Sequence, residues 1–121
     1  MKSSHPESNL QQACVKWFNL QYHSRAEFLF CIPNGGYRSR IEAKIMSGEG
    51  VRAGVSDLFL ALPSNGCHGL FIEMKSQTGR VSHHQKEFLA RQAKAGYQCE
   101  VCNSLENFIK IVTEYMKGVK L

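Results

Sequence analysis

The chain has no long apolar stretch, and no run approaches the roughly 20 residues that a helix needs to cross a bilayer. Its first residues, MKSSHPE, also lack the apolar segment of a secretory signal. We therefore expect a cytoplasmic protein without a membrane partner. Internal repeats and low-complexity segments are absent too, which argues against a repeat protein and a disordered chain. With 121 residues there is room for one core, so we expect a single domain over residues 1–121.

Cysteine occurs five times, an odd number in a chain without an export signal, so we expect reduced thiols. Cys99 and Cys102 have the spacing of half a zinc site, and Cys67 with His68 is the nearest candidate for the other half. The segment 97–102 has the pattern of a buried strand, where cysteine behaves as a small apolar residue. We therefore favour core packing over zinc binding for this pair.

Acidic residues are fewer than basic ones, 10 against 15, and the formal net charge is +5. Clustered Lys and Arg bind polyanions by releasing counterions from phosphates, so this balance is compatible with a nucleic-acid partner. Many basic proteins have no such partner, however, and charge alone leaves the question open.

Four helix starts are marked by a capping residue and a Glu or Gln three positions later. These pairs are Ser4 with Glu7, Ser39 with Glu42, Ser82 with Gln85, and Asn103 with Glu106. The helices should end near residues 22, 48, 96 and 117, and apolar runs predict strands at 28–32, 57–62, 69–75 and 97–102. The order α-β-α-β-β-α-β-α predicts an α/β sandwich in which helices flank a central mixed sheet of about four strands.

Two acids and a lysine fall on the two strands of an expected hairpin. Side chains alternate along a strand, so Glu73 and Lys75 share one face. If residues 63–67 form the hairpin loop, Leu62 pairs with His68, and the same register puts Asp57 opposite Glu73. Facing Cβ atoms of such a pair lie about 5 Å apart.

Two carboxylates at that distance repel each other unless a cation lies between them. A hard divalent cation such as Mg²⁺ binds one or two carboxylates, keeps several waters and suits phosphodiester hydrolysis. Lys75 could then orient the attacking water or stabilise charge on the phosphate. The alternative is an ordinary charge pair on a solvated strand, but the apolar neighbours of Glu73 indicate an inner strand, where charges need an explanation.

At these residues the sequence resembles the PD-(D/E)xK nucleases. Gly54-Val55-Ser56-Asp57, a gap of fifteen residues and Glu73-Met74-Lys75 match the signature, and the chain is most similar to the VRR-NUC branch. The resemblance extends along nearly the whole chain, through segments 32–36, 49–54, 71–75, 79–85 and 96–97. One departure is Ser56, which stands where the family usually has proline.

The resemblance implies roles for six residues. Asp57, Glu73 and the backbone carbonyl of Met74 would bind the metal, and Lys75 would be the catalytic lysine. Mg²⁺ would be the cofactor, with Mn²⁺ able to substitute. Glu7 matches an acid that such nucleases contribute from their first helix to a second metal or through water, and Gln85 matches a glutamine usual in this branch. Both are equally explained as helix-cap partners.

DNA-contacting residues are expected around the glycine turn that follows the first strand. Glycines there would let a phosphate backbone approach closely, and basic residues would bind it, although a surface of solvated charges explains each residue singly. The candidates are Asn34, Gly35, Gly36, Tyr37, Arg38, Arg40, Lys44 and Arg52.

The function that we predict is a magnesium-dependent DNA endonuclease, selective for structure because no separate base-reading module is visible. Stand-alone, often viral, members of the similar family are homodimers that resolve four-way (Holliday) junctions in recombination and repair, so the resemblance implies that role. The alternatives are a flap- or nick-processing or restriction-like nuclease, and a non-catalytic DNA-binding module of the same fold.

Overall fold

The structure is a computed structural model that describes residues 5–33 and 39–121. The order of its elements is the expected one, with a short 3-10 helix, η1, added after the first helix. The elements are α1 (Pro6–Gln21), η1 (His23–Phe28), β1 (Leu29–Cys31), α2 (Arg40–Gly48), β2 (Leu58–Leu60), β3 (Leu70–Met74), α3 (His83–Lys94), β4 (Gln98–Cys102) and α4 (Leu105–Lys117).

The four strands form one mixed sheet in the order β1-β2-β3-β4. β1 and β3 both run antiparallel to β2, while β3 and β4 are parallel and joined through α3. Leu58 pairs with Ile72, and continuing this register by one residue puts Asp57 opposite Glu73, as predicted. The expected α/β class with a mixed four-stranded sheet is confirmed.

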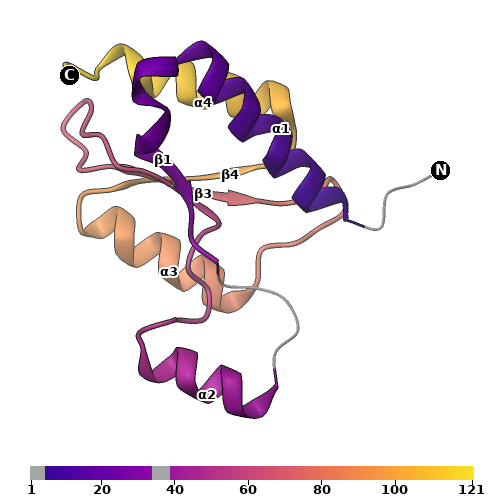
Figure 1. Cartoon of the computed structure of the whole chain (residues 1–121). Helices are drawn as coiled ribbons and strands as arrows, with labels where there is room; N and C mark the ends of the chain where they lie inside the picture. Colours follow the sequence, from indigo (N-terminus) through magenta and orange to yellow (C-terminus); the bar gives the residue numbers. More distant parts are fainter. Residues whose placement is uncertain (1–4, 34–38) are drawn as a thin grey trace.

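Helices cover both faces of the sheet, with α1 and α4 on one face and α3 on the other (Figure 1). Leu70, Ile72 and Met74 of β3 are buried on the side of α1 and α4, where most of the core lies. Phe71 points to the opposite face, where its ring lies 5.1 Å from that of Phe88 on α3. The alternation of β3 therefore assigns Glu73, two residues beyond Phe71, to the side of α3.

α2 lies beyond α3 and away from the sheet (Figure 1). All its residues are exposed except Met46, which is half-buried. Among the described helices, none is long and apolar enough to cross a membrane.

The predicted helix starts are confirmed at α2 and α3, where Ser39 and Ser82 accept hydrogen bonds from the backbone N–H groups of Glu42 and Gln85. The prediction for α4 was wrong, because Ser104 rather than Asn103 is the capping residue and accepts from the N–H of Asn107.

The prediction for α1 was also wrong. Its N-cap is His5, and Pro6 follows as the first helical residue, a position that suits proline because no helical partner needs its N–H. Ser4 itself lies outside the described residues.

Tyr115 of α4 is buried, although the sequence pattern did not single it out. Its hydroxyl donates to the carbonyl of Leu62 at 2.6 Å, and its own carbonyl accepts from the hydroxyl of Ser64. These two bonds fix the loop between β2 and β3 to α4, at the end of the hairpin opposite Asp57.

Candidate active site

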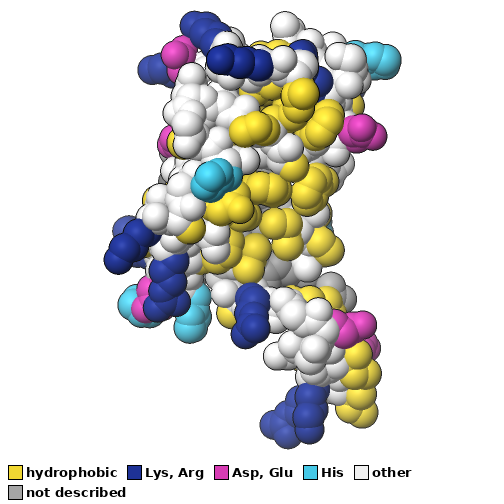
Figure 2. Space-filling view, turned by 90° about the vertical axis from the view of Figure 1, so that its left-hand side faces the viewer, with side chains coloured by type: hydrophobic (Ala, Val, Ile, Leu, Met, Phe, Trp, Pro, Cys, Tyr) yellow, Lys and Arg dark blue, Asp and Glu magenta, His cyan; other side chains and the backbone are white. Residues whose placement is uncertain are grey.

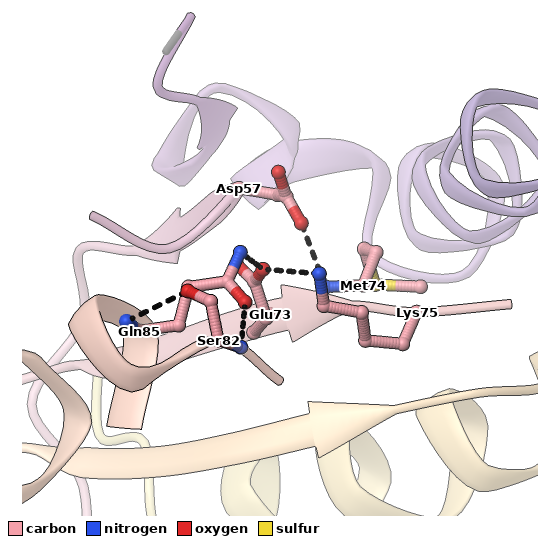
Figure 3. Close-up of polar contacts among 6 residues, drawn as sticks. All are labelled: Asp57, Glu73, Met74, Lys75, Ser82 and Gln85. Carbon is pink, nitrogen blue, oxygen red and sulfur yellow. Dashed lines mark hydrogen bonds and ion pairs between the residues drawn. The ribbon is translucent and has the colours of Figure 1, made fainter. Parts of the chain in front are cut away.

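Asp57 is held in place through both its backbone and its side chain. It directly precedes β2, and its carbonyl accepts a hydrogen bond of 2.8 Å from the N–H of Ile32. Its carboxylate oxygen Oδ2 accepts from the N–H of Met74, also at 2.8 Å (Figure 3). The carboxylate is therefore held against the end of β3.

Glu73 is almost completely buried, with 2% of its surface exposed. Its Oε2 accepts a hydrogen bond from the side-chain amide of Gln85 and lies 3.5 Å from the Nζ of Lys75 (Figure 3). Its Oε1 is buried and has no hydrogen-bond partner within the part of the chain that the structure describes. A buried carboxylate oxygen without a donor is costly, so this atom calls for a cation or for a donor beyond the described residues.

The electrostatics of the site centre on this carboxyl group. Burial, together with the neighbouring carboxylate of Asp57, raises the pKa of Glu73 to about 7, against an opposing effect of Lys75. Near neutral pH the pair therefore resists carrying two negative charges. A cation bound between the two groups would relieve this repulsion and favour the ionised form.

Gln85 combines the two roles that the sequence left as alternatives. Its Oε1 accepts from the N–H of Ser82 at 2.8 Å, which completes the capping box at the start of α3. Its Nε2 donates to Glu73. Because the cap fixes the oxygen end of the amide, the nitrogen end is directed at the carboxylate.

A cavity of about 440 Å³ opens at the end of β3, next to the first turn of α1 and the first turn of α3. The structure thus brings together all the residues predicted to be catalytic. Ser8 and Gln11 also line it and were not predicted. The sequence pointed only to Gln11, which lies one helical turn after Glu7. The complete lining is Glu7, Ser8, Gln11, Asp57, Glu73, Met74, Lys75 and Gln85.

The donor atoms at this cavity suit a hard divalent cation. Carboxylates of Asp57 and Glu73 meet there, and one buried oxygen of Glu73 is unpartnered. No group of three or more His, Cys, Asp or Glu that could bind a metal occurs within residues 5–33 and 39–121. A pair of carboxylates with a backbone carbonyl fits Mg²⁺, which commonly takes one or two carboxylates and keeps several waters.

The cysteine pair offers a different environment. Cys102 is buried in the core, Cys99 is half-buried, and both are free thiols. Burial raises the pKa of Cys99 to about 11 and that of Cys102 to about 12. Cys102 packs in the core as a small apolar residue, and within the described residues no group of three or more His, Cys, Asp or Glu that could hold a metal includes either thiol.

The segment before Asp57 packs closely on α3. Gly54 has a φ of +84°, and a Cβ at this position would lie 2.6 Å from the carbonyl oxygen of His84. Only glycine meets both requirements. Ser56 follows, and its hydroxyl is buried without a hydrogen-bond partner in the described part of the chain.

The residues predicted to contact DNA lie outside this cavity or outside the described chain. Arg40 and Lys44 are exposed on α2, one helical turn apart, and Arg52 is exposed on the segment that follows. Asn34, Gly35, Gly36, Tyr37 and Arg38 lie outside the described residues.

Comparisons with known proteins agree with this arrangement. The family model of the VRR-NUC domain matches residues 1–106. A solved structure described as a VRR_NUC domain protein is similar to this chain with a TM-score of 0.83 and 26% sequence identity. The similarity covers 99% of this chain and 94% of that one. The search of curated proteins yielded no match.

Proposed function

Because the chain belongs to the VRR-NUC family of nuclease domains, we propose that it is a magnesium-dependent endonuclease that cleaves branched DNA. One observation carries this proposal. The buried carboxylate of Glu73 faces that of Asp57 at an open cavity, with one oxygen unpartnered and the ammonium group of Lys75 within 3.5 Å of the other. A charge pair with only a structural role would not need the repulsive second carboxylate.

Asp57, Glu73 through Oε1, and the backbone carbonyl of Met74 would hold the metal, and Mn²⁺ would substitute for Mg²⁺. When bound, the ion would polarise the scissile phosphate and lower the pKa of the attacking water. The N–H of Met74 keeps Asp57 in position for this task, and Gln85 does the same for Glu73.

Lys75 would stabilise the charge that develops on the phosphate during hydrolysis. Its side chain is 16% exposed and lines the cavity, so its ammonium group can reach a bound phosphate while Glu73 keeps it in place. Glu7 lines the same cavity from the first turn of α1. From there it would contact a second cation or orient a water at the scissile bond.

DNA binding would rely on charge and on the surface beyond the cavity. The net charge of +5 favours a polyanionic partner. We propose that the exposed Arg40, Lys44 and Arg52, together with residues 34–38, contact the sugar-phosphate backbone around the branch.

We also propose that the enzyme acts as a homodimer. Apolar side chains gather over the middle of one face and along one side of α2 (Figure 2). Ile41 and Ile45 on α2 are 73% and 56% exposed, and Phe30 on the edge strand β1 is 47% exposed. A second copy would cover such a surface, and two-fold symmetry would supply one active site for each of the two strands cut in a four-way junction.

The test is incubation of the protein with a labelled four-way junction, a flap, a nicked duplex and a linear duplex, with and without Mg²⁺. We expect paired cuts in the junction that require Mg²⁺ and disappear in Asp57→Ala. Preferential cutting of the flap or the nicked duplex would show that the protein is a flap- or nick-processing nuclease and not a junction-resolving one. Binding of the junction without cleavage of any substrate would identify a non-catalytic DNA-binding module.

A further inference from the structure

A second polar crevice lies at the end of the sheet that carries the active site. β3 and β4 are adjacent and parallel, and the helices that follow them leave to opposite faces, α3 to one and α4 to the other (Figure 1). In open α/β sheets, ligands bind in the crevice that this divergence creates at the carboxyl ends of the strands. The loops after β3 and β4 border such a crevice here.

This crevice contains a cavity of about 380 Å³ that adjoins the active site. Lys75 lines both cavities, so a ligand in the crevice would lie next to a phosphate bound in the active site. The lining consists of Lys75, Ser76, Gln77, Gly79, Val81, Val101, Asn103 and Asn107.

Three side-chain amides, those of Gln77, Asn103 and Asn107, give the crevice its chemistry. Gln77 and Asn103 are exposed and Asn107 is half-buried, and none of the three amide groups bonds to another residue that the structure describes. Asn107 belongs to the first turn of α4, and the cap there is formed by its backbone N–H and Ser104 rather than by its side chain. The amides are therefore available to a ligand.

The ligand that fits this lining is a nucleobase. Amides offer donors and acceptors together, as the edges of bases do, and Asn and Gln pair with adenine through two hydrogen bonds. Val81 and Val101 add apolar surface for the flat face of a base. A phosphate would require more positive charge than Lys75 alone, which already serves the active site.

We propose that this crevice, which we call the base crevice, binds the base of an unpaired nucleotide next to the scissile phosphate. This proposal rests on the proposed nuclease function and gives a physical origin for its selectivity. A base at a branch point or flap enters freely, whereas a base within an intact duplex must first be unpaired and unstacked. The enzyme would then cut where an unpaired nucleotide already exists.

The test compares substrates with a base and without one. After the cut has been mapped on a junction or flap, each of the two nucleotides that flank it is replaced by an abasic residue. We expect the parent enzyme to cleave one abasic substrate with kcat/KM reduced about 10-fold, the scale of losing one amide–base pair. Equal kcat/KM for the normal and both abasic substrates would overturn the base crevice and leave the nuclease function intact.

The protein side of the test is the double variant Asn103→Ala/Asn107→Ala, with Asn19→Ala, an exposed amide on α1, as the matched control. We expect the double variant to cleave the normal substrate about 10-fold less well and to be insensitive to the abasic replacement. Asn19→Ala should behave as the parent. A folded double variant that still distinguishes the two substrates would overturn the proposal.

A binding measurement separates this proposal from the nuclease function. The fluorescent base 2-aminopurine, placed at the unpaired position, should brighten on binding to Asp57→Ala, because leaving the stack relieves its quenching and the crevice has no aromatic lining. We expect no brightening when Asn103→Ala and Asn107→Ala are added. If Asp57→Ala brightens the probe but the parent protein cleaves no substrate, only the nuclease function is overturned. If Asp57→Ala does not brighten the probe, the base crevice is overturned.

Discussion

The side-chain amide of Gln85 lies between the backbone N–H of Ser82 and the buried carboxylate of Glu73, and it is hydrogen-bonded to both. One residue thus completes the cap at the start of α3 and orients an active-site acid. Since the amide cannot turn without breaking the cap, Glu73 always faces a donor on that side. This arrangement makes the chemistry of the site sensitive to the start of α3.

Replacing the donor by an acceptor tests this arrangement. Gln85→Glu keeps a side chain that can complete the capping box but brings a third carboxylate to Glu73, which raises the pKa of Glu73 further. We expect the acid limb of the pH–rate profile to move to higher pH and kcat/KM at pH 7 to fall about 10-fold or more. Gln21→Glu, at the exposed end of α1, is the control. An unchanged profile would show that Gln85 does not control the ionisation of Glu73.

Lys75→Ala should separate binding from catalysis. The ammonium group lies beside Glu73 and stabilises charge only as it develops, so we expect a loss of about 10²-fold or more in kcat. Mg²⁺ and junction binding should remain, as measured by calorimetry and gel shift. Lys86→Ala, an exposed lysine on α3, should cleave at the parental rate. If Lys75→Ala does the same, the lysine has no part in the mechanism.

Calorimetric titration with Mg²⁺ tests the ligand pair directly. We expect the parent to bind the ion and Asp57→Ala to bind it at least about 10-fold more weakly, because one of two charged ligands is missing. Glu106→Ala, which removes an exposed carboxylate from the first turn of α4, should bind as the parent does. Equal affinity in the parent and Asp57→Ala would favour a non-catalytic module.

The raised pKa of Glu73 predicts a pH dependence of stability in metal-free buffer. The folded chain retains the proton on Glu73 up to a pH of about 7, whereas the ordinary value is 4.5. Between these values the folded state binds more protons than the unfolded state, so the free energy of unfolding falls as pH rises. We expect this fall, relative to Glu73→Gln, in urea titrations at pH 4.5, 6 and 7.5. Parallel pH dependence in the two proteins would contradict the buried, proton-retaining carboxyl.

Ser56→Ala should stabilise the fold. Its hydroxyl is buried and no described residue bonds to it, so removing it relieves an uncompensated desolvation of about 1 kcal/mol or more. Urea unfolding of the variant should give a higher midpoint with an unchanged slope. Ser47→Ala, exposed on α2, should leave the midpoint within experimental error. A lower midpoint for Ser56→Ala would mean that the hydroxyl has a partner after all.

The facing of Asp57 and Glu73 could be predicted from sequence, because the alternation of apolar residues and the turn at 63–67 determine the register of a hairpin. Capping at Ser39 and Ser82 was equally accessible, since it depends on residues three positions apart. The start of α4 could not be predicted from the sequence, because Asn103 and Ser104 are both good caps and only the path of the chain selects between them.

Contacts between distant segments were beyond any local pattern. The bond from Gln85 to Glu73 joins a helix to a strand, and its existence depends on how α3 packs on the sheet. The burial of Tyr115 depends in the same way on a carbonyl in the hairpin loop. The base crevice is the clearest case, since Gln77 and Asn107 meet only because two helices diverge.

The close approach of Gly54 to His84 has a consequence for the evolution of this site. The segment that leads to Asp57 packs on the same turn of α3 that carries Gln85, with no room for even a methyl group at Gly54. A single added carbon there would push apart two halves of the catalytic apparatus without altering any of its functional groups. Loss of activity in a natural variant can therefore originate at a residue that never meets the substrate.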